Sequence, residues 1–201
     1  MKKILENAAK AFSSLLSVSY HIVLGRKGRA IDIVIVFKSE NFFHLAGLHK
    51  LKKSYAFTKN SREKIFTFII KNKITTDMIK DDENFSIIYD RLVVIQNIAN
   101  ILESNDTVFY LFDSRKVSIG SRLKADYVAK GPVNNQFFAF TFFVKNNDDP
   151  SSYCLNSIFP CDSYDYSKKQ TQYTVLLKER IMLTADKELR DVLFRQKNYT
   201  N

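Results

Sequence analysis

The sequence is poor in the residues that cross-link or kink a chain. Its 201 residues include two cysteines, three prolines, five glycines and no tryptophan. Cys154 and Cys161 are too few for a disulfide framework, and they lack the spaced histidine and cysteine companions of a structural zinc site. We therefore expect reduced thiols and a cytoplasmic location. A chain of this length can bury a core without disulfides or metals.

Long apolar runs and several functional signatures are also absent. No apolar run approaches the roughly 18 residues of a transmembrane helix, and Glu6, Asn7 and Lys10 interrupt the N-terminal segment before it reaches the length of a secretory signal. The scattered glycines form no phosphate-binding loop, and no serine has the glycine neighbours of a nucleophile elbow. No histidine and carboxylate spacing suits a metal. We expect no membrane partner, no cofactor and no metal.

Positive charge is what the sequence has in excess. Lysine and arginine number 31 against 21 for aspartate and glutamate, which gives a formal net charge of +10. Such an excess raises the local concentration of anions and favours nucleic acid or an anionic membrane face as a partner. Of the two we expect nucleic acid, and the hypothesis developed below makes it RNA.

The first half of the chain shows mostly helical periodicity. Apolar residues at helical spacing predict helices at 2–17, 61–73 and 84–102, with Ser61 capping the second. Residues of alternating polarity on both sides of the basic segment 25–28 predict a β-hairpin with a basic tip.

The second half of the chain alternates apolar and polar residues as β-strands do. For the tail after residue 185 we predict a helical start. Helices followed by strands favour an α+β fold, with an N-terminal helix, a β-hairpin and helices followed by an antiparallel sheet of about four to five strands. We expect one domain over 1–201, with a helix-rich half at about 1–104, a sheet-rich half at about 105–185 and a tail at 186–201. The predicted strands are 107–112, about 124–130, 136–145, 153–159 and 173–183.

Acid–base chemistry is centred on two histidines. His44 and His49 lie five residues apart in FFHLAGLHKLKK and suit a shared site. An imidazole can take a proton from a ribose 2′-hydroxyl or give one to a leaving 5′-oxygen, and a neighbouring cation such as Lys50 or Lys52 can stabilise the charge of the phosphorane. The alternative, which the spacing alone favours, is structural: His44 is a hydrogen-bonded residue on a short apolar helix, and the lysines are simply solvated.

Two further basic clusters are candidate nucleic-acid contacts. Ser121, Arg122 and Lys124 precede or begin a predicted strand, where cations at a strand edge can hold a phosphate, although a polar loop explains them equally well. Lys178 and Arg180 share one face of the last predicted strand, near loop tyrosines able to stack on a base. Charge on an exposed strand face is common, so this second cluster alone decides nothing.

The segment NFFHLAGLHKLKK resembles a signature of the phage-type barnase, EndoU, colicin and RelE-like nuclease family, in its fourth subgroup. The later order of TVFYLFD, SRLKADYVAK, an aromatic strand and a basic strand supports the resemblance. It implies N-terminal helices followed by a four-stranded antiparallel sheet, hence a barnase/RelE-like fold. The implied site residues are His44 and His49 as acid and base, Lys50 as a phosphate contact, and Ser121, Lys124 and Lys178 as secondary contacts.

The leading hypothesis is a metal-independent endoribonuclease of a toxin or mobile-element type. In it the ribose 2′-hydroxyl attacks the adjacent phosphate and leaves a 2′,3′-cyclic end. An immunity or antitoxin protein would then be a second partner beside RNA. The alternative is a non-catalytic basic module of a mobile element that binds RNA or protein. A third reading is a structural or regulatory protein whose charge serves solubility.

Overall fold

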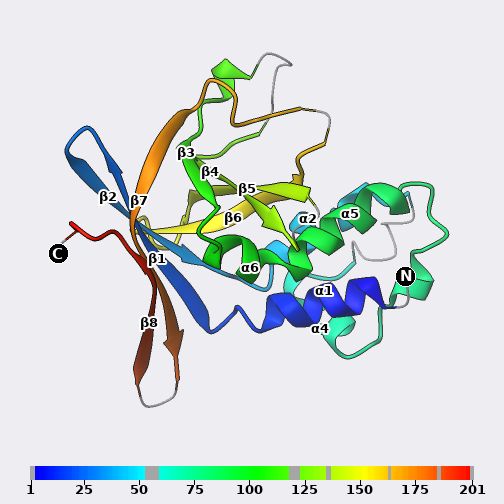
Figure 1. Cartoon of the computed structure of the whole chain (residues 1–201). Coiled ribbons are helices and arrows are strands. Elements are labelled where there is room, and N and C mark those ends of the chain that lie inside the picture. The colour runs from blue at the N-terminus through cyan, green and yellow to red at the C-terminus, as the bar shows by residue number, and fades with distance from the viewer. Residues whose placement is uncertain are drawn as a thin grey trace.

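A closed β-barrel forms the centre of the structure, which is a computed structural model (Figure 1). The described residues are 3–52, 59–117, 123–134, 137–162, 164–184 and 187–199. Strands pair in the order β1-β2-β6-β5-β4-β3-β7, and β7 pairs again with β1, which closes the ring, while β8 pairs with β7 outside it. The strands are β1 Val18–Arg26, β2 Arg29–Val36, β3 Val108–Leu111, β4 Tyr127–Val133, β5 Phe137–Lys145, β6 Ser152–Pro160, β7 Thr171–Leu183 and β8 Glu188–Arg195.

The ring closes because β7 is long enough to pair with three strands. One of its edges pairs with β3 at residues 171–173 and with β8 at residues 177–183. Its other edge pairs antiparallel with β1 over residues 174–182. On the far side of the β1–β2 hairpin, residues 34–36 of β2 run parallel to β6, so the barrel is mixed.

The expected antiparallel sheet of about four to five strands is wrong. Strands do form near each of the predicted segments, but the hairpin from the first half inserts between β6 and β7 and closes them into a barrel. Pairing between segments so far apart in sequence leaves no local pattern, so periodicity predicts the strands without predicting their neighbours. The barnase/RelE-like sheet implied by the resemblance is therefore corrected, over the described residues, to a seven-stranded barrel with one extra strand.

The tail is a strand, so the helix expected after residue 185 is wrong. Beyond its contact with β3, the edge of β7 offers unpaired backbone groups, and β8 satisfies them by antiparallel pairing. Leu193 of β8 also packs, partly buried, against the main hydrophobic cluster. Tertiary pairing of this kind outweighs a weak local preference for helix.

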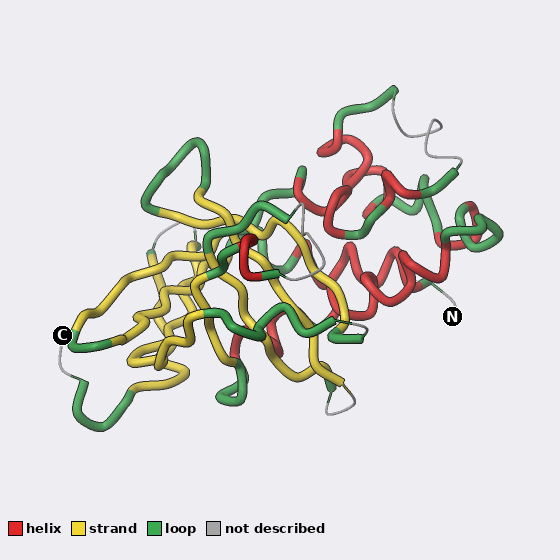
Figure 2. The backbone as a smooth tube through the Cα atoms, turned by 90° about the horizontal axis from the view of Figure 1, so that it is seen from above, coloured by secondary structure: helices red, strands yellow, loops and turns green. Residues whose placement is uncertain are grey.

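The helices lie together on one side of the barrel (Figures 1 and 2). The side chain of Ser61 accepts a hydrogen bond from the backbone N–H of Lys64 at 3.2 Å, which confirms the predicted cap. The predicted helix at 84–102 is two helices that meet at Asn97. Within the described residues, no helix combines the length and apolar character needed to cross a membrane. The helices are α1 Ile4–Ser13, α2 Asn41–Leu45, α4 Arg62–Ile70, α5 Phe85–Gln96 and α6 Ile98–Glu103.

Strand β5 is apolar on both faces because both faces are covered. Phe143 belongs to the main cluster, which joins the helices to the barrel. Phe140 and Phe142 belong to a smaller cluster on the opposite face, where Tyr164 and Tyr166 of the loop between β6 and β7 pack on them. Strand β5 lies between β4 and β6 in the barrel.

Candidate active site

The segment that carries the two histidines folds as two short helical turns joined by a glycine. Helix α2 ends at Leu45, and a 3-10 turn, η1, spans Leu48–Lys50. Gly47 between them has a φ of 75°, a left-handed conformation that favours glycine. A Cβ on this residue would also lie 3.1 Å from the side chain of Arg91. The buried side chains that anchor the segment are Phe42, Phe43, Leu45, Leu48 and Leu51.

His44 and His49 form a stacked pair of imidazole rings at the surface. Their ring centroids lie 4.6 Å apart, and the rings are 12° from parallel. Phe43 contacts the His49 ring with a centroid separation of 6.4 Å, which restricts its orientation. Both histidines and Lys50 are exposed, so the structure brings the three predicted acid–base and phosphate-binding residues together where a substrate can reach them.

The surroundings of this pair are positively charged, and they keep both imidazoles neutral. Partial burial and the charges of Arg62 and Arg91 hold the pKa of His44 below its usual value, and Lys50 acts in the same direction. Partial burial and coupling to His44 lower the pKa of His49 to about 4. Two parallel rings this close would repel one another if both carried a proton.

Arg91 of α5 holds the histidine segment in place. Its guanidinium donates a hydrogen bond to the carbonyl oxygen of Leu45 at 3.3 Å and lies 5.6 Å from the ring centroid of Phe159 on β6. Burial lowers the pKa of Arg91, although the group remains charged at any working pH. Neither Arg91 nor Arg62 was predicted as a site residue, because Arg91 lies on α5, 46 residues beyond Leu45, and Arg62 begins a separate helix, α4.

An open cavity of about 310 Å³ is lined in part by Lys50, the residue that follows His49. Lys50 and Arg91 form its basic side, and Phe159 and Tyr166 provide aromatic surface. Cations able to bind a phosphate therefore lie beside rings able to stack on a base. Its remaining lining residues are Ile87, Asp90, Pro160 and Asp162.

The other predicted nucleic-acid contacts are not gathered around the histidines. Lys52 is exposed and forms an ion pair with Glu83. Lys124 is exposed beside a separate hollow with Arg115. The predicted contacts at Ser121 and Arg122 lie outside the described residues.

Lys178 and Arg180 face inward, which does not suit the predicted contact with nucleic acid. They stand opposite Ile22 and Tyr20 of β1, on the face that packs against the end of α6. Lys178 is only 1% exposed and donates to the carbonyl oxygen of Ser104 at 2.7 Å. Burial lowers its pKa to about 8. Side chains alternate between the two faces of a strand, so Lys178 and Arg180 share one face. Only the strand register shows that this face is the inner one.

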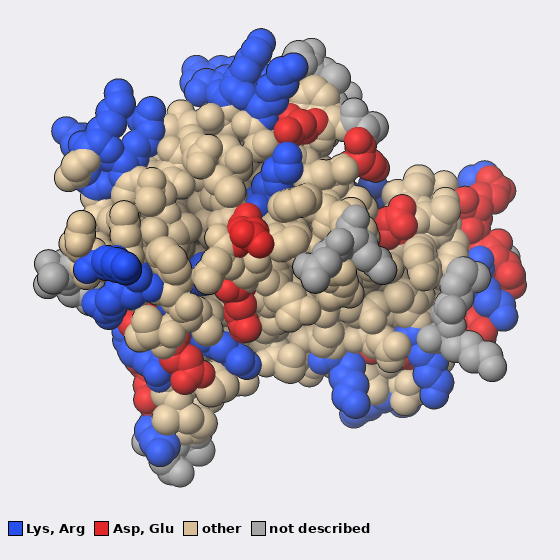
Figure 3. Space-filling model, in the orientation of Figure 1, with Lys and Arg blue, Asp and Glu red and all other residues tan. Residues whose placement is uncertain are grey.

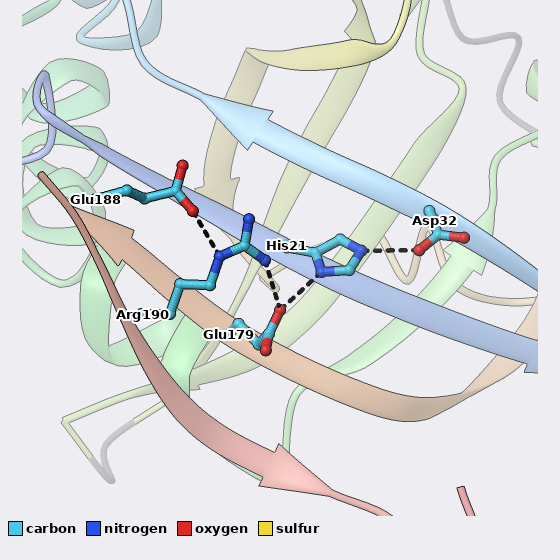
Figure 4. A network of polar contacts seen from close by, with 5 residues as sticks. All are labelled: His21, Asp32, Glu179, Glu188 and Arg190. Atoms are coloured by element: carbon cyan, nitrogen blue, oxygen red, sulfur yellow. Dashed lines mark hydrogen bonds and ion pairs between the residues drawn. The ribbon is translucent and has the colours of Figure 1, made fainter. Parts of the chain in front are cut away.

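His21 lies on the opposite, outer face of the same strands, in a network that the sequence did not reveal (Figure 4). One ring nitrogen contacts Glu179 of β7 at 2.9 Å and the other contacts Asp32 of β2 at 2.8 Å. Arg190 of β8 approaches the same Glu179 carboxylate at 3.5 Å. Since both ring nitrogens face carboxylates, the protonated ring satisfies the geometry best. The network thus links four neighbouring strands.

Two neutral imidazoles among cations, beside a cavity with aromatic walls, form a site suited to a phosphodiester substrate. The class of protein, shown by the family match, is a barnase- and EndoU-like nuclease. The chain belongs to the family described as phage-Barnase-EndoU-ColicinE5/D-RelE like nuclease4, which matches residues 4–191. No curated protein and no solved structure matches the chain.

Proposed function

We propose that the protein is a metal-independent endoribonuclease of a toxin or mobile-element type, with its site at the His44–His49 pair. The observation that carries the proposal is the stacking of the two rings at 4.6 Å beside Lys50 and Arg91. This arrangement provides two proton-transfer groups together with the exposed Lys50 and the partly buried Arg91 in one site. Cleavage of RNA by its own 2′-hydroxyl needs these groups: a base, an acid and positive charge near the phosphate.

The low pKa of His49 assigns it the role of the base. His49, with a pKa of about 4, is neutral at physiological pH and serves as the base that takes the proton of the 2′-hydroxyl. Burial is the larger cause of the lowered pKa of His44, and the charges of Arg62, Arg91 and Lys50 are the smaller one. An RNA phosphate bound between Lys50 and Arg91 offsets the charges. His44 then carries the proton that it gives to the leaving 5′-oxygen. The products are a 2′,3′-cyclic phosphate and a 5′-hydroxyl.

The same cations support a reaction without a divalent metal. Lys50 and Arg91 supply positive charge where the phosphorane would form, so they do the electrostatic work that a bound metal does in other nucleases. The positive charge of Lys50 and Arg91 would also repel a divalent metal ion from this position. Cleavage is therefore expected to persist in EDTA.

The test is cleavage of a labelled mixed RNA in EDTA, measured as kcat/KM across the acid to neutral range. One histidine must be neutral and the other protonated, so the rate is greatest between their two pKa values in the free protein. Both values are lowered from 6.5. We therefore expect a bell-shaped profile with its maximum below pH 6.5. Replacing Arg91 with methionine removes one cation and should move the maximum to higher pH.

A protein that leaves RNA intact at every pH in this range is not the proposed nuclease. Binding that weakens steeply with salt, without cleavage, would instead identify a non-catalytic RNA-binding module. An EDTA-sensitive rate would keep the nuclease but contradict its metal independence.

A further inference from the structure

The tip of the β1–β2 hairpin contains residues that destabilise it. Arg26 and Arg29 are direct cross-strand partners, and like charges in that position are destabilising. Lys27 and Gly28 form the two-residue turn, with φ values of 49° and 74°. Such a turn requires positive φ at both positions and favours Asn-Gly, so Lys27 is an unfavourable choice there. The like-charged pair and the unfavourable turn residue lie within four consecutive residues, and two such destabilising choices indicate a functional constraint.

The three cations at this tip are free to meet a partner. Arg26, Lys27 and Arg29 are all exposed. In the described part of the chain, none of them forms an ion pair. Figure 3 shows basic side chains gathered over this end of the hairpin. The nearest carboxylate on the hairpin strands is Asp32, which is held by His21.

Two hollows flank the hairpin tip and are lined by groups that suit nucleotides. One has a volume of about 490 Å³ and includes Tyr199 and the side-chain amide residues Gln196 and Asn198. The other has a volume of about 400 Å³ and includes Tyr173. Tyrosine rings can stack on bases and amides can pair with base edges, while cations hold the backbone. An acidic protein would use the cations but would have no need of these flanking groups.

We propose that the hairpin tip, defined as Arg26, Lys27 and Arg29 with its two flanking hollows, is a second binding site for single-stranded RNA. The tip lies at the end of the barrel away from helices α1, α4 and α5, whereas α2, which carries His44, packs against α4 and β6 (Figure 1). A short substrate occupies the histidine site alone, and a longer strand reaches the hairpin tip as well. The choice of RNA over other polyanions rests on the proposed function.

The test variant is Arg26→Thr/Lys27→Asn/Arg29→Thr. Threonine suits a strand, and Asn-Gly is the favoured turn, so this variant should fold and melt roughly 2 °C higher than the wild type. The matched control is Lys10→Gln/Lys71→Gln/Lys187→Gln, which removes the same net charge from three exposed lysines elsewhere. Both are compared with the wild type for binding to a long 2′-O-methyl RNA, which the proposed chemistry cannot cut.

We expect the hairpin variant to bind the long RNA at least about tenfold more weakly, with the slope of log K against log salt reduced by about 2. Cleavage of a dinucleotide should be unchanged. Equal losses in the hairpin and control variants, or no loss in the hairpin variant, would overturn the second site. The second site would also be overturned if the hairpin variant kept its affinity for RNA and lost binding to polyglutamate, an acidic polypeptide. RNA held through the hairpin but never cut would overturn the proposed function and leave this site standing.

Discussion

His49→Ala is expected to lower kcat/KM for RNA cleavage by about 10²–10⁴-fold, the usual contribution of a positioned general base. His49 is the histidine whose pKa, at about 4, leaves it unprotonated at the working pH. His44→Ala should cause a loss of similar size, because it removes the proposed general acid. Because the two rings stack at 4.6 Å and act on one phosphate, the double variant should lose little more than the worse single variant.

The control for this loss is Lys52→Ala, which removes an exposed cation two residues beyond Lys50. Its ammonium is paired with Glu83 and does not line the cavity beside the histidines. We expect its rate to stay within about threefold of the wild type, since exposed ion pairs contribute little. If Lys52→Ala were as inactive as His49→Ala, the loss would reflect general charge and not proton transfer. Circular dichroism would verify that each variant is folded.

His21→Gln is expected to lower the free energy of unfolding by about 2 kcal/mol at pH 6, the scale of a hydrogen bond to a charged group. The variant leaves Glu179, which is only 7% exposed, without its imidazolium partner. Asp32→Asn is the milder comparison, since that carboxylate is largely exposed and should cost well under about 1 kcal/mol. Urea denaturation of both variants measures the difference.

The contribution of His21 should also depend on pH in a defined direction. Burial opposes the charge on His21, but its hydrogen bonds to Glu179 and Asp32 prevail and raise its pKa above 6.5. A raised pKa stabilises the fold fully below pH 6.5, and the stabilisation is lost as the pH rises through the folded-state value. The difference in free energy of unfolding between the wild type and His21→Gln should therefore shrink from pH 6 toward alkaline pH. A gap that widens would contradict the charged network in Figure 4.

Local patterns predicted most of the elements. The β1–β2 hairpin, the Ser61 cap and strands β3 to β7 all fall near their expected positions. Each is recorded in a few consecutive residues, through alternation, helical spacing or turn chemistry. The motif of the candidate site was visible for the same reason, because His44, His49 and Lys50 lie within one short segment.

Features fixed by pairing between distant segments were not predictable. The β1–β7 seam closes the barrel across more than 140 residues of sequence, and it alone decides that Lys178 faces inward and His21 outward. Arg91 and Arg62 reach the histidine pair from other helices. No periodicity encodes these approaches, so the sequence offered two histidines without the cations that tune them.

The most direct test of the account is the chemistry of the ends that the protein leaves on a labelled mixed RNA in EDTA, with His49→Ala beside the wild type. The account predicts 2′,3′-cyclic phosphate and 5′-hydroxyl ends from the wild type and nearly intact RNA from the variant. Ends bearing 3′-hydroxyl and 5′-phosphate, or equal cleavage by both proteins, would contradict it.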